Sequence, residues 1–249
     1  MTLSLRVGAD AFPSRLGPVS TDEKRSRSDN GVSRRRHERR LEILAATRSL
    51  FDERGRTDAQ IEDIAKAVGI NRAIIYRHFN GKEELFAMTL VGYMDELHIA
   101  LDEADDPELS PADRLRSVSG RFLEFGREFP AFVDCAQSLL RRPGDELMRE
   151  VSQSVMFRLG ASVSRCLAVV VAVLEAGVES GDFTMQDPNL LANVLYSQAL
   201  GGLNLARLQL SIREVTPGLP EVDVLSFDQV RSYIIEAAVA MARGVGAKA

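Results

Sequence analysis

The sequence predicts an all-α protein. Apolar residues recur every three or four positions through most of the 249-residue chain, and strand-like alternation is nowhere sustained. Proline and glycine residues divide the chain into segments of helical length, which gives about nine helices. We expect a small N-terminal domain of three helices and a larger helical domain after it.

The first helices follow from caps and apolar spacing. Residues 33–54 form one helix, with an apolar face from Leu41 to Phe51. Thr57 and Gln60 match a capping box, so the second helix begins there and ends at Gly69. Asn71 caps a short third helix that ends near residue 78. A fourth helix runs from Gly81 to about residue 103, long enough to leave the first domain.

The remaining helices lie between clear breaks. Two prolines and several acidic residues interrupt the chain at residues 105–111, and Pro143-Gly144 stops it again. Asp187 and Pro188 fit the cap and first turn of a later helix. The expected helices span residues 111–126, 129–142, 145–180, 188–212 and 227–243, with a loop at 213–226.

Composition indicates a globular chain. It is 45% hydrophobic and 27% charged, which suffices for one large or two smaller domains. Cys135 and Cys166 both lie in apolar helical patterns, which indicates buried thiols in a reducing compartment and not a disulfide or metal ligand. No secretory signal is apparent, and the longest apolar run, residues 166–174, is too short to span a bilayer. We therefore expect a soluble cytoplasmic protein.

The most informative segment is residues 60–82, whose spacing is that of a helix-turn-helix. Ala65 is small where two helices cross, and Gly69 suits the left-handed backbone that ends the first of them. Apolar residues such as Ile64 and Ile75 hold the second helix against the first. Such a helix projects as a rigid probe that fits the major groove, so the segment is predicted to read double-stranded DNA.

The distribution of charge along the chain also indicates DNA binding by this segment. Residues 24–86 contain 15 Lys and Arg against 10 Asp and Glu, whereas residues 87–249 contain 14 against 23. The basic part coincides with the helix-turn-helix, as expected of a module that binds phosphates. The acidic remainder is expected to point away from DNA.

Residues 1–32 are rich in Ser, Arg, Gly and Pro, and they predict a disordered arm. One interpretation is that the arm is a dispensable tail, or that the start codon has been assigned too early. The other is that it is a basic extension that follows the phosphates or enters the minor groove. Arg34, Arg35 and Arg36 at the start of the first helix are expected to contact phosphates. The predicted domains are thus residues 1–32, 33–80 and 81–249.

The first 86 residues resemble the TetR family of transcriptional regulators, over roughly residues 36–86. The matching residues are Ile43, Leu44, Ala45, Ala46, Leu50, Phe51, Gly55, Ile64, Ala65, Gly69, Tyr76, His78, Phe79, Lys82, Glu83 and Leu85. Where the family has paired threonines this chain has Ala59-Gln60, and where it favours Gly-Thr this chain has Ala73-Ile74. These departures concern the DNA sequence that is read and some phosphate contacts.

Roles within the recognition helix follow from side-chain chemistry. Arg72 and Arg77 are candidates for guanine O6 and N7, with a phosphate contact as the alternative for each. Ala73 and Ile74 suit a thymine methyl group. Tyr76, His78, Lys82 and Gln60 carry hydroxyl, imidazole, ammonium and amide groups, respectively, which suit phosphate contacts. The resemblance implies this role for Tyr76, His78 and Lys82.

The larger domain is rich in Met and aromatic residues, which either form its core or line a cavity for an apolar ligand. The resemblance implies a pocket between the helices after the head, without naming its residues. The candidates are Tyr93, His98, Phe122, Phe125, Phe132, Met156 and Tyr196.

Two glycines, Gly201 and Gly202, interrupt the penultimate helix, where small residues permit close helix approach. Together with the last helix they resemble the surface through which the family forms homodimers. A twofold dimer places its recognition helices about one DNA turn apart, or a multiple of it, and so predicts a pseudo-palindromic operator.

Catalytic patterns are poor. His37, His78 and His98 do not form a metal-ligand spacing, and neither a phosphate-binding loop nor a nucleophile elbow is complete. We expect no cofactor, no metal and no catalysis. The leading hypothesis is a dimeric repressor released by a small apolar effector. The alternatives are a DNA-binding dimer without an inducer, whose larger domain only dimerises or docks a protein, and an enzyme with a vestigial head.

Overall fold

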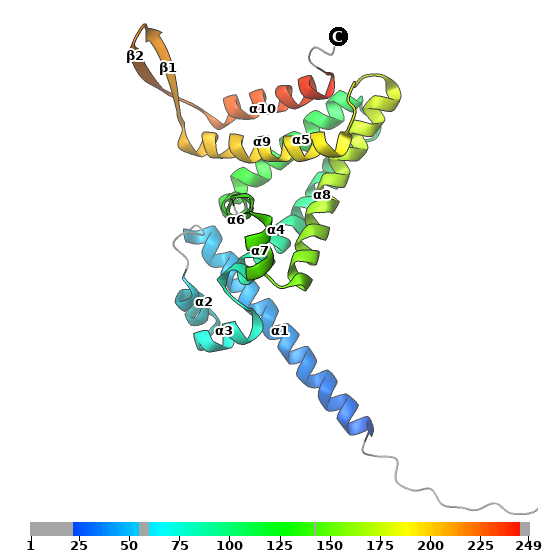
Figure 1. The fold of residues 1–249 in the computed structure, drawn as a ribbon, viewed down its shortest axis with the longest axis vertical. Helices are drawn as coiled ribbons and strands as arrows, with labels where there is room; N and C mark the ends of the chain where they lie inside the picture. Colours follow the sequence, from blue (N-terminus) through cyan, green and yellow to red (C-terminus); the bar gives the residue numbers. More distant parts are fainter. Residues whose placement is uncertain (1–21, 55–59, 142, 245–249) are drawn as a thin grey trace, which may run out of the picture. The chain divides into compact units, whose positions relative to one another are not determined.

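The computed structural model describes residues 22–54, 60–141 and 143–244 (Figure 1). The chain divides into two compact units, Met1–Arg40 and Leu41–Ala249. Most of the predicted capping box at Thr57 lies outside the described residues, as do residues 1–21 of the predicted arm.

The first unit contains the beginning of α1 (Asp22–Arg54). The helix starts eleven residues before the predicted Ser33 and so includes residues 22–32, which we expected to belong to the arm. Arg34, Arg35 and Arg36 are exposed, and Arg34 Nε lies 3.4 Å from Glu38 Oε1 one turn on.

The second unit is helical apart from one hairpin, which bears out the predicted fold class. After the end of α1 it contains α2 (Ile61–Val68), α3 (Arg72–His78), α4 (Lys82–Ala104), α5 (Pro111–Glu128), α6 (Pro130–Leu140), α7 (Gly144–Glu150), α8 (Gln153–Ser180), α9 (Pro188–Leu208), β1 (Leu210–Thr216), β2 (Leu219–Val224) and α10 (Phe227–Ala242). The described residues thus contain ten helices instead of about nine.

The predicted helix over residues 145–180 is broken at Val151 and Ser152, which separate α7 from α8. Val151 is buried in extended conformation, and the Ser152 backbone N–H donates to the Glu84 carboxylate of α4 at 3.3 Å. The break therefore depends on a contact with another helix, which local periodicity does not reveal.

Residues 210–224 form an antiparallel hairpin where we predicted a helix end and a loop. Helix α9 ends because Gln209 adopts a left-handed backbone, with φ 56°. Pro217 and Gly218, with φ 82° at Gly218, suit a type II turn between the strands. The hairpin projects beyond the ends of α9 and α10 that it joins (Figure 1).

The core of the larger part lies among α4, α5, α8, α9 and α10, which pack on one another. Helix α8 packs against α4, α5 and α9. Among the described residues it alone is long and apolar enough to cross a membrane by length and composition, with a mean hydropathy of 1.8 over its most apolar window. Only 33% of that window is buried, so α8 also has an apolar outer face.

Candidate DNA interface and ligand cavity

Helices α2 and α3 form the predicted helix-turn-helix. Gly69 caps α2 in the left-handed conformation, with φ 71°, and the Ile70 N–H donates to Ala65 O at 2.9 Å. Asn71 caps α3 as predicted, because its Oδ1 accepts the Ala73 N–H at 2.9 Å. Helix α2 begins at Ile61, and the Gln60 N–H donates to the Asp63 carboxylate at 3.3 Å.

Helix α3 has a buried and an exposed face. Ile75, followed by Phe79, is almost fully buried and fixes the helix on the core. The exposed face carries Arg72, Ala73, Tyr76 and Arg77. The other predicted DNA contacts are exposed at Gln60 and half-buried at Ile74, His78 and Lys82.

Two of these side chains have defined partners. Arg72 Nη1 donates to Glu62 Oε1 of α2 at 2.9 Å, and this hydrogen bond lowers the pKa of Glu62. The pair is exposed, so it is available to solvent and to a ligand. Lys82 Nζ lies 5.1 Å from the centre of the Phe86 ring, so a cation–π contact holds this ammonium group near the start of α4.

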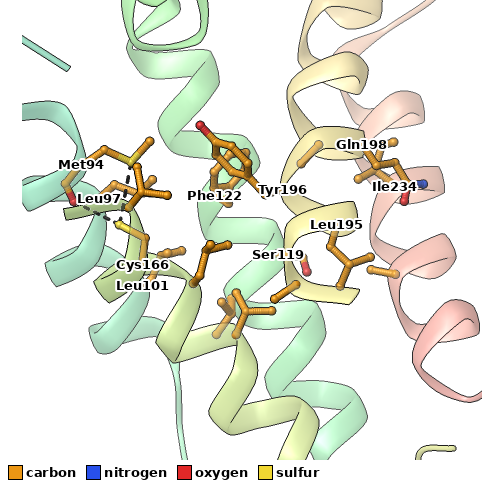
Figure 2. A pocket seen from close by; sticks show the side chains of 17 residues that line it. Met94, Leu97, Leu101, Ser119, Phe122, Cys166, Leu195, Tyr196, Gln198 and Ile234 are labelled. Carbon is orange, nitrogen blue, oxygen red and sulfur yellow. Dashed lines mark hydrogen bonds between the residues drawn. The ribbon is translucent and has the colours of Figure 1, made fainter. Parts of the chain in front are cut away.

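A cavity of about 50 Å³ lies among α4, α5, α8, α9 and α10 (Figure 2). Its wall is almost wholly apolar, with Ser119, Gln198 and Tyr196 as the main polar side chains. Cys166 lies on this wall and its thiol donates to Met94 O at 3.2 Å. Burial raises the pKa of this thiol to about 12, so it remains protonated at neutral pH.

Of the predicted ligand residues, Phe122 and Tyr196 line this cavity, with ring centroids 5.9 Å apart and edge to face. The structure does not bring the other five to its wall. Tyr93, Phe125 and Phe132 belong to an aromatic cluster of the core, Met156 lines a groove on the outside of α8, and His98 lines neither.

Sequence reasoning missed most of the wall, which includes Met94, Leu97, Leu101, Val118, Val163, Leu167, Leu195 and Ile234. Each fits an ordinary helical core pattern, so nothing in the sequence distinguishes it from a core residue.

Helix α4 joins the cavity to the head through Arg48 of α1. The Arg48 guanidinium forms a bidentate pair with Glu96, with Nη2 2.6 Å from Oε2, and lies 4.4 Å from the centre of the Tyr93 ring. Tyr93 donates its hydroxyl to Asp52 Oδ1 at 2.5 Å. Burial opposes the charge on Arg48, but the bond to Glu96 and nearby anionic groups outweigh it and raise the pKa of Arg48.

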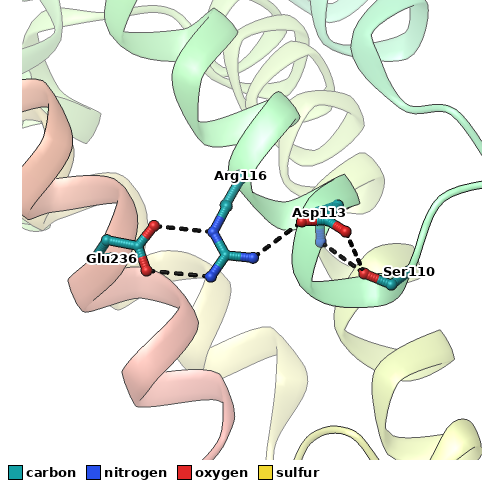
Figure 3. A network of polar contacts seen from close by, with 4 residues as sticks. All are labelled: Ser110, Asp113, Arg116 and Glu236. Atoms are coloured by element: carbon teal, nitrogen blue, oxygen red, sulfur yellow. Dashed lines mark hydrogen bonds and ion pairs between the residues drawn. The ribbon is translucent and has the colours of Figure 1, made fainter.

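The last helix, α10, is held on α5 by a second polar network (Figure 3). Arg116 of α5 donates from Nε and Nη2 to Glu236 of α10 at 2.9 and 3.2 Å, and from Nη1 to Asp113 at 3.1 Å. Ser110, the cap of α5, donates to Asp113 at 2.7 Å. The Arg116 bond lowers the pKa of Glu236, which keeps it charged at neutral pH.

These features define a class of protein: a helix-turn-helix that presents an exposed basic helix, attached to a helical domain that encloses an apolar cavity. Within the described residues no cluster of His, Cys, Asp and Glu is suited to hold a metal ion.

Comparisons with known proteins agree with this class. The family model described as bacterial regulatory proteins, tetR family, matches residues 43–88. The chain is 29% identical over 158 residues to the HTH-type transcriptional repressor KstR2 of Mycobacterium tuberculosis, which covers 64% of this chain and 74% of that one.

Solved structures share the fold. FadR of Bacillus subtilis, in complex with stearoyl-CoA, has a TM-score of 0.58 and 15% identity, covering 80% of this chain and 97% of that one. RolR in complex with resorcinol has a TM-score of 0.58 and 16% identity, covering 84% and 90%.

Residues 43–88 match the TetR family of bacterial regulatory proteins, and the chain is similar to that family's DNA-binding regulators of transcription.

Proposed function

We propose that this protein is a cytoplasmic repressor without catalytic activity, which binds a pseudo-palindromic operator as a dimer and is released by a small apolar effector. The observation that carries the proposal is that one helix, α4, borders both the cavity and the head. Its Met94 and Leu97 line the cavity, and their neighbours Tyr93 and Glu96 contact Arg48. KstR2 is named a repressor, which supports the sign of the regulation.

At the operator, Arg72 and Arg77 contact base edges from the exposed face of α3. Ala73 and Ile74 touch thymine methyl groups, whereas the phosphate contacts come from Gln60, Tyr76, His78, Lys82, Arg34, Arg35 and Arg36. The exposed pair with Glu62 holds the Arg72 side chain beside the turn before DNA arrives. DNA binding then exchanges this carboxylate for a guanine edge.

The dimer forms through α9 and α10. The exposed face of α9 is symmetric about Ala199: Leu190 and Leu208 lie nine residues to either side, and Ser197 and Gly201 lie two residues to either side. A helix with this pattern packs on a copy of itself in antiparallel orientation, with the small residues at the crossing. On α10, Tyr233 and Met241 extend the same apolar surface, and Tyr233 is 80% exposed.

The effector enters the apolar cavity. A cavity of about 50 Å³ is smaller than the roughly 300 Å³ of a drug-sized ligand site, so entry separates the cavity walls. Because Met94 and Leu97 lie on one of these walls, separation displaces α4 and the contacts that α4 makes with Arg48. The effector lowers operator affinity only if it binds the displaced state more tightly.

Thermal shift measurements against a lipid and drug library test the effector, because a bound ligand stabilises the fold by mass action. A hit must raise the melting temperature of the wild-type chain and lower its affinity for an operator selected from random DNA. Ser119→Leu fills the cavity and is expected to abolish both effects, whereas Ser154→Leu makes the same change at an exposed position of α8. Operator binding with no stabilising ligand would favour the regulator without an inducer.

A further inference from the structure

The hairpin β1–β2 has one exposed apolar face. Its register pairs Leu210 with Val224 and Ile212 with Val222, so these four side chains lie on the same side of the two strands. Their exposed fractions run from 44% to 79%. On the opposite face the paired residues nearest α9 and α10 are polar, and there Arg213 pairs with Asp223 at 3.4 Å. A two-stranded hairpin alone is at best marginally stable in water, so this apolar face is expected to pack on another surface.

A second apolar surface is the groove of about 640 Å³ on the outside of α8. It runs from Met156 to Glu175 along one face of the helix, and Asn189 and Asn193 of α9 complete it. This face accounts for the low burial of the most apolar part of α8. The twenty residues from Met156 to Glu175 extend about 30 Å, and the seven residues of β1 extend about 23 Å, so the two surfaces are comparable in length.

The symmetry of α9 brings these surfaces together. If two copies of α9 cross in antiparallel orientation at Ala199, the residue opposite Leu210 is Pro188 of the partner copy, since both lie eleven residues from the centre. The hairpin of one copy therefore leaves α9 beside Asn189 and Asn193, where the groove of the other copy begins.

We propose that the hairpin of each protomer lies in the α8–α9 groove of a second copy of this chain, so that the two protomers exchange their hairpins. The inference rests on the α9-mediated dimer of the proposed function and adds to it a contact made by the hairpin. The apolar strand face covers the outer face of α8, and the polar face with Arg213 and Asp223 remains in water.

A disulfide between chains tests the arrangement directly. One preparation carries only Val222→Cys and a second carries only Ala168→Cys, so that a bond between the two sites must join different chains. The native Cys135 and Cys166 are buried, and a mixture of wild-type chains controls for them. After mixing, subunit exchange and mild oxidation, we expect a covalent dimer whose peptide map joins residues 168 and 222. Asp223→Cys, on the opposite strand face, is the matched control, and with it the covalent dimer is lost.

A second measurement does not depend on cysteine chemistry. Ile212→Glu places a charge on the apolar strand face and is expected to raise the dimer Kd at least about tenfold, because an apolar side chain that is buried in the dimer is replaced by a charged one. Ser211→Glu, on the polar face, leaves the Kd unchanged. Equal dimer Kd values for the two variants, or no bond between residues 168 and 222 in a chain that is dimeric, would overturn the exchange.

Operator binding by the same preparations distinguishes failure of the hairpin exchange from failure of the proposed function. A dimer that binds operator DNA but forms no bond between residues 168 and 222 overturns the hairpin exchange and leaves the proposed function intact. A chain that is monomeric at micromolar concentration and binds no operator overturns both.

Discussion

We propose that Arg72 determines sequence preference and that Lys82 contributes to affinity for any DNA sequence. Arg72 stands at the exposed start of α3 with a donor fork that fits guanine, whereas Lys82 offers a point charge from the start of α4. Arg72→Ala is expected to weaken binding to the selected operator by about 1–3 kcal/mol and to relax specificity at one position, and Lys82→Ala to weaken all sequences alike and lower the salt slope by about one. Fluorescence anisotropy on operator and random duplexes measures both. Equal loss on the two duplexes for Arg72→Ala contradicts its role.

Arg48 couples head and larger domain through a bond to Glu96 and a stack on Tyr93. Arg48→Ala is expected to lower the free energy of unfolding by about 1–2 kcal/mol, because a charged hydrogen bond and a cation–π contact are lost at a partly exposed site. A double-mutant cycle with Glu96→Ala, followed by urea denaturation, should give a coupling energy of at least about 0.5 kcal/mol. If the effects of the two substitutions on the free energy of unfolding are additive, Arg48 and Glu96 are not energetically coupled and the assigned role of Arg48 is wrong.

At the scale of the element, the two adjacent glycines of α9 have different roles. A Cβ on Gly202 would lie 2.8 Å from Ile234 Cγ1, so this glycine allows α10 to pack closely within the protomer. Gly201 has open space around it and faces outward, toward the proposed partner. The sequence indicated close helix approach at this pair, but it did not distinguish a contact inside the protomer from one between protomers.

Substitution by alanine separates these roles. Gly202→Ala is expected to lower the free energy of unfolding by about 1–3 kcal/mol, because α10 must move to relieve the clash. Gly201→Ala raises helix propensity by about 1 kcal/mol, so it is not expected to destabilise the isolated protomer. Any loss of thermal stability that it causes is expected to come from weaker dimerisation and therefore to depend on protein concentration. Thermal denaturation at two protein concentrations distinguishes the outcomes. A concentration-independent loss of equal size in both variants would contradict the assignment.

The elements that sequence predicted well are those with local signals. Asn71, Gly69 and the spacing of Ile64 and Ile75 determine α2 and α3 through neighbours in the chain. The hairpin was missed because Gln209 ends α9 without a glycine, and because the alternation from Leu210 onward is short and contains prolines. The cavity wall was missed because it combines ordinary core residues from five helices, which only tertiary packing brings together.

At the scale of the whole molecule, a basic head with a helix-turn-helix is joined to an acidic helical domain that we propose to dimerise. Between them α4 carries cavity residues and head contacts on successive positions, so a change at the cavity reaches Arg48 without a long path. In the proposed dimer, the exposed face of α9 and the exposed apolar side chains of the hairpin pack on a second copy, and the twofold symmetry of such a dimer predicts a symmetric operator.

The measurement that tests this account most directly is selection of bound DNA from a random pool by the purified chain, followed by sequencing. The account predicts two half-sites related by a twofold axis, with their centres about 10 base pairs or a multiple of that apart, and loss of the enriched guanine positions with Arg72→Ala. Failure to enrich any sequence, or enrichment of a single asymmetric site, would contradict it.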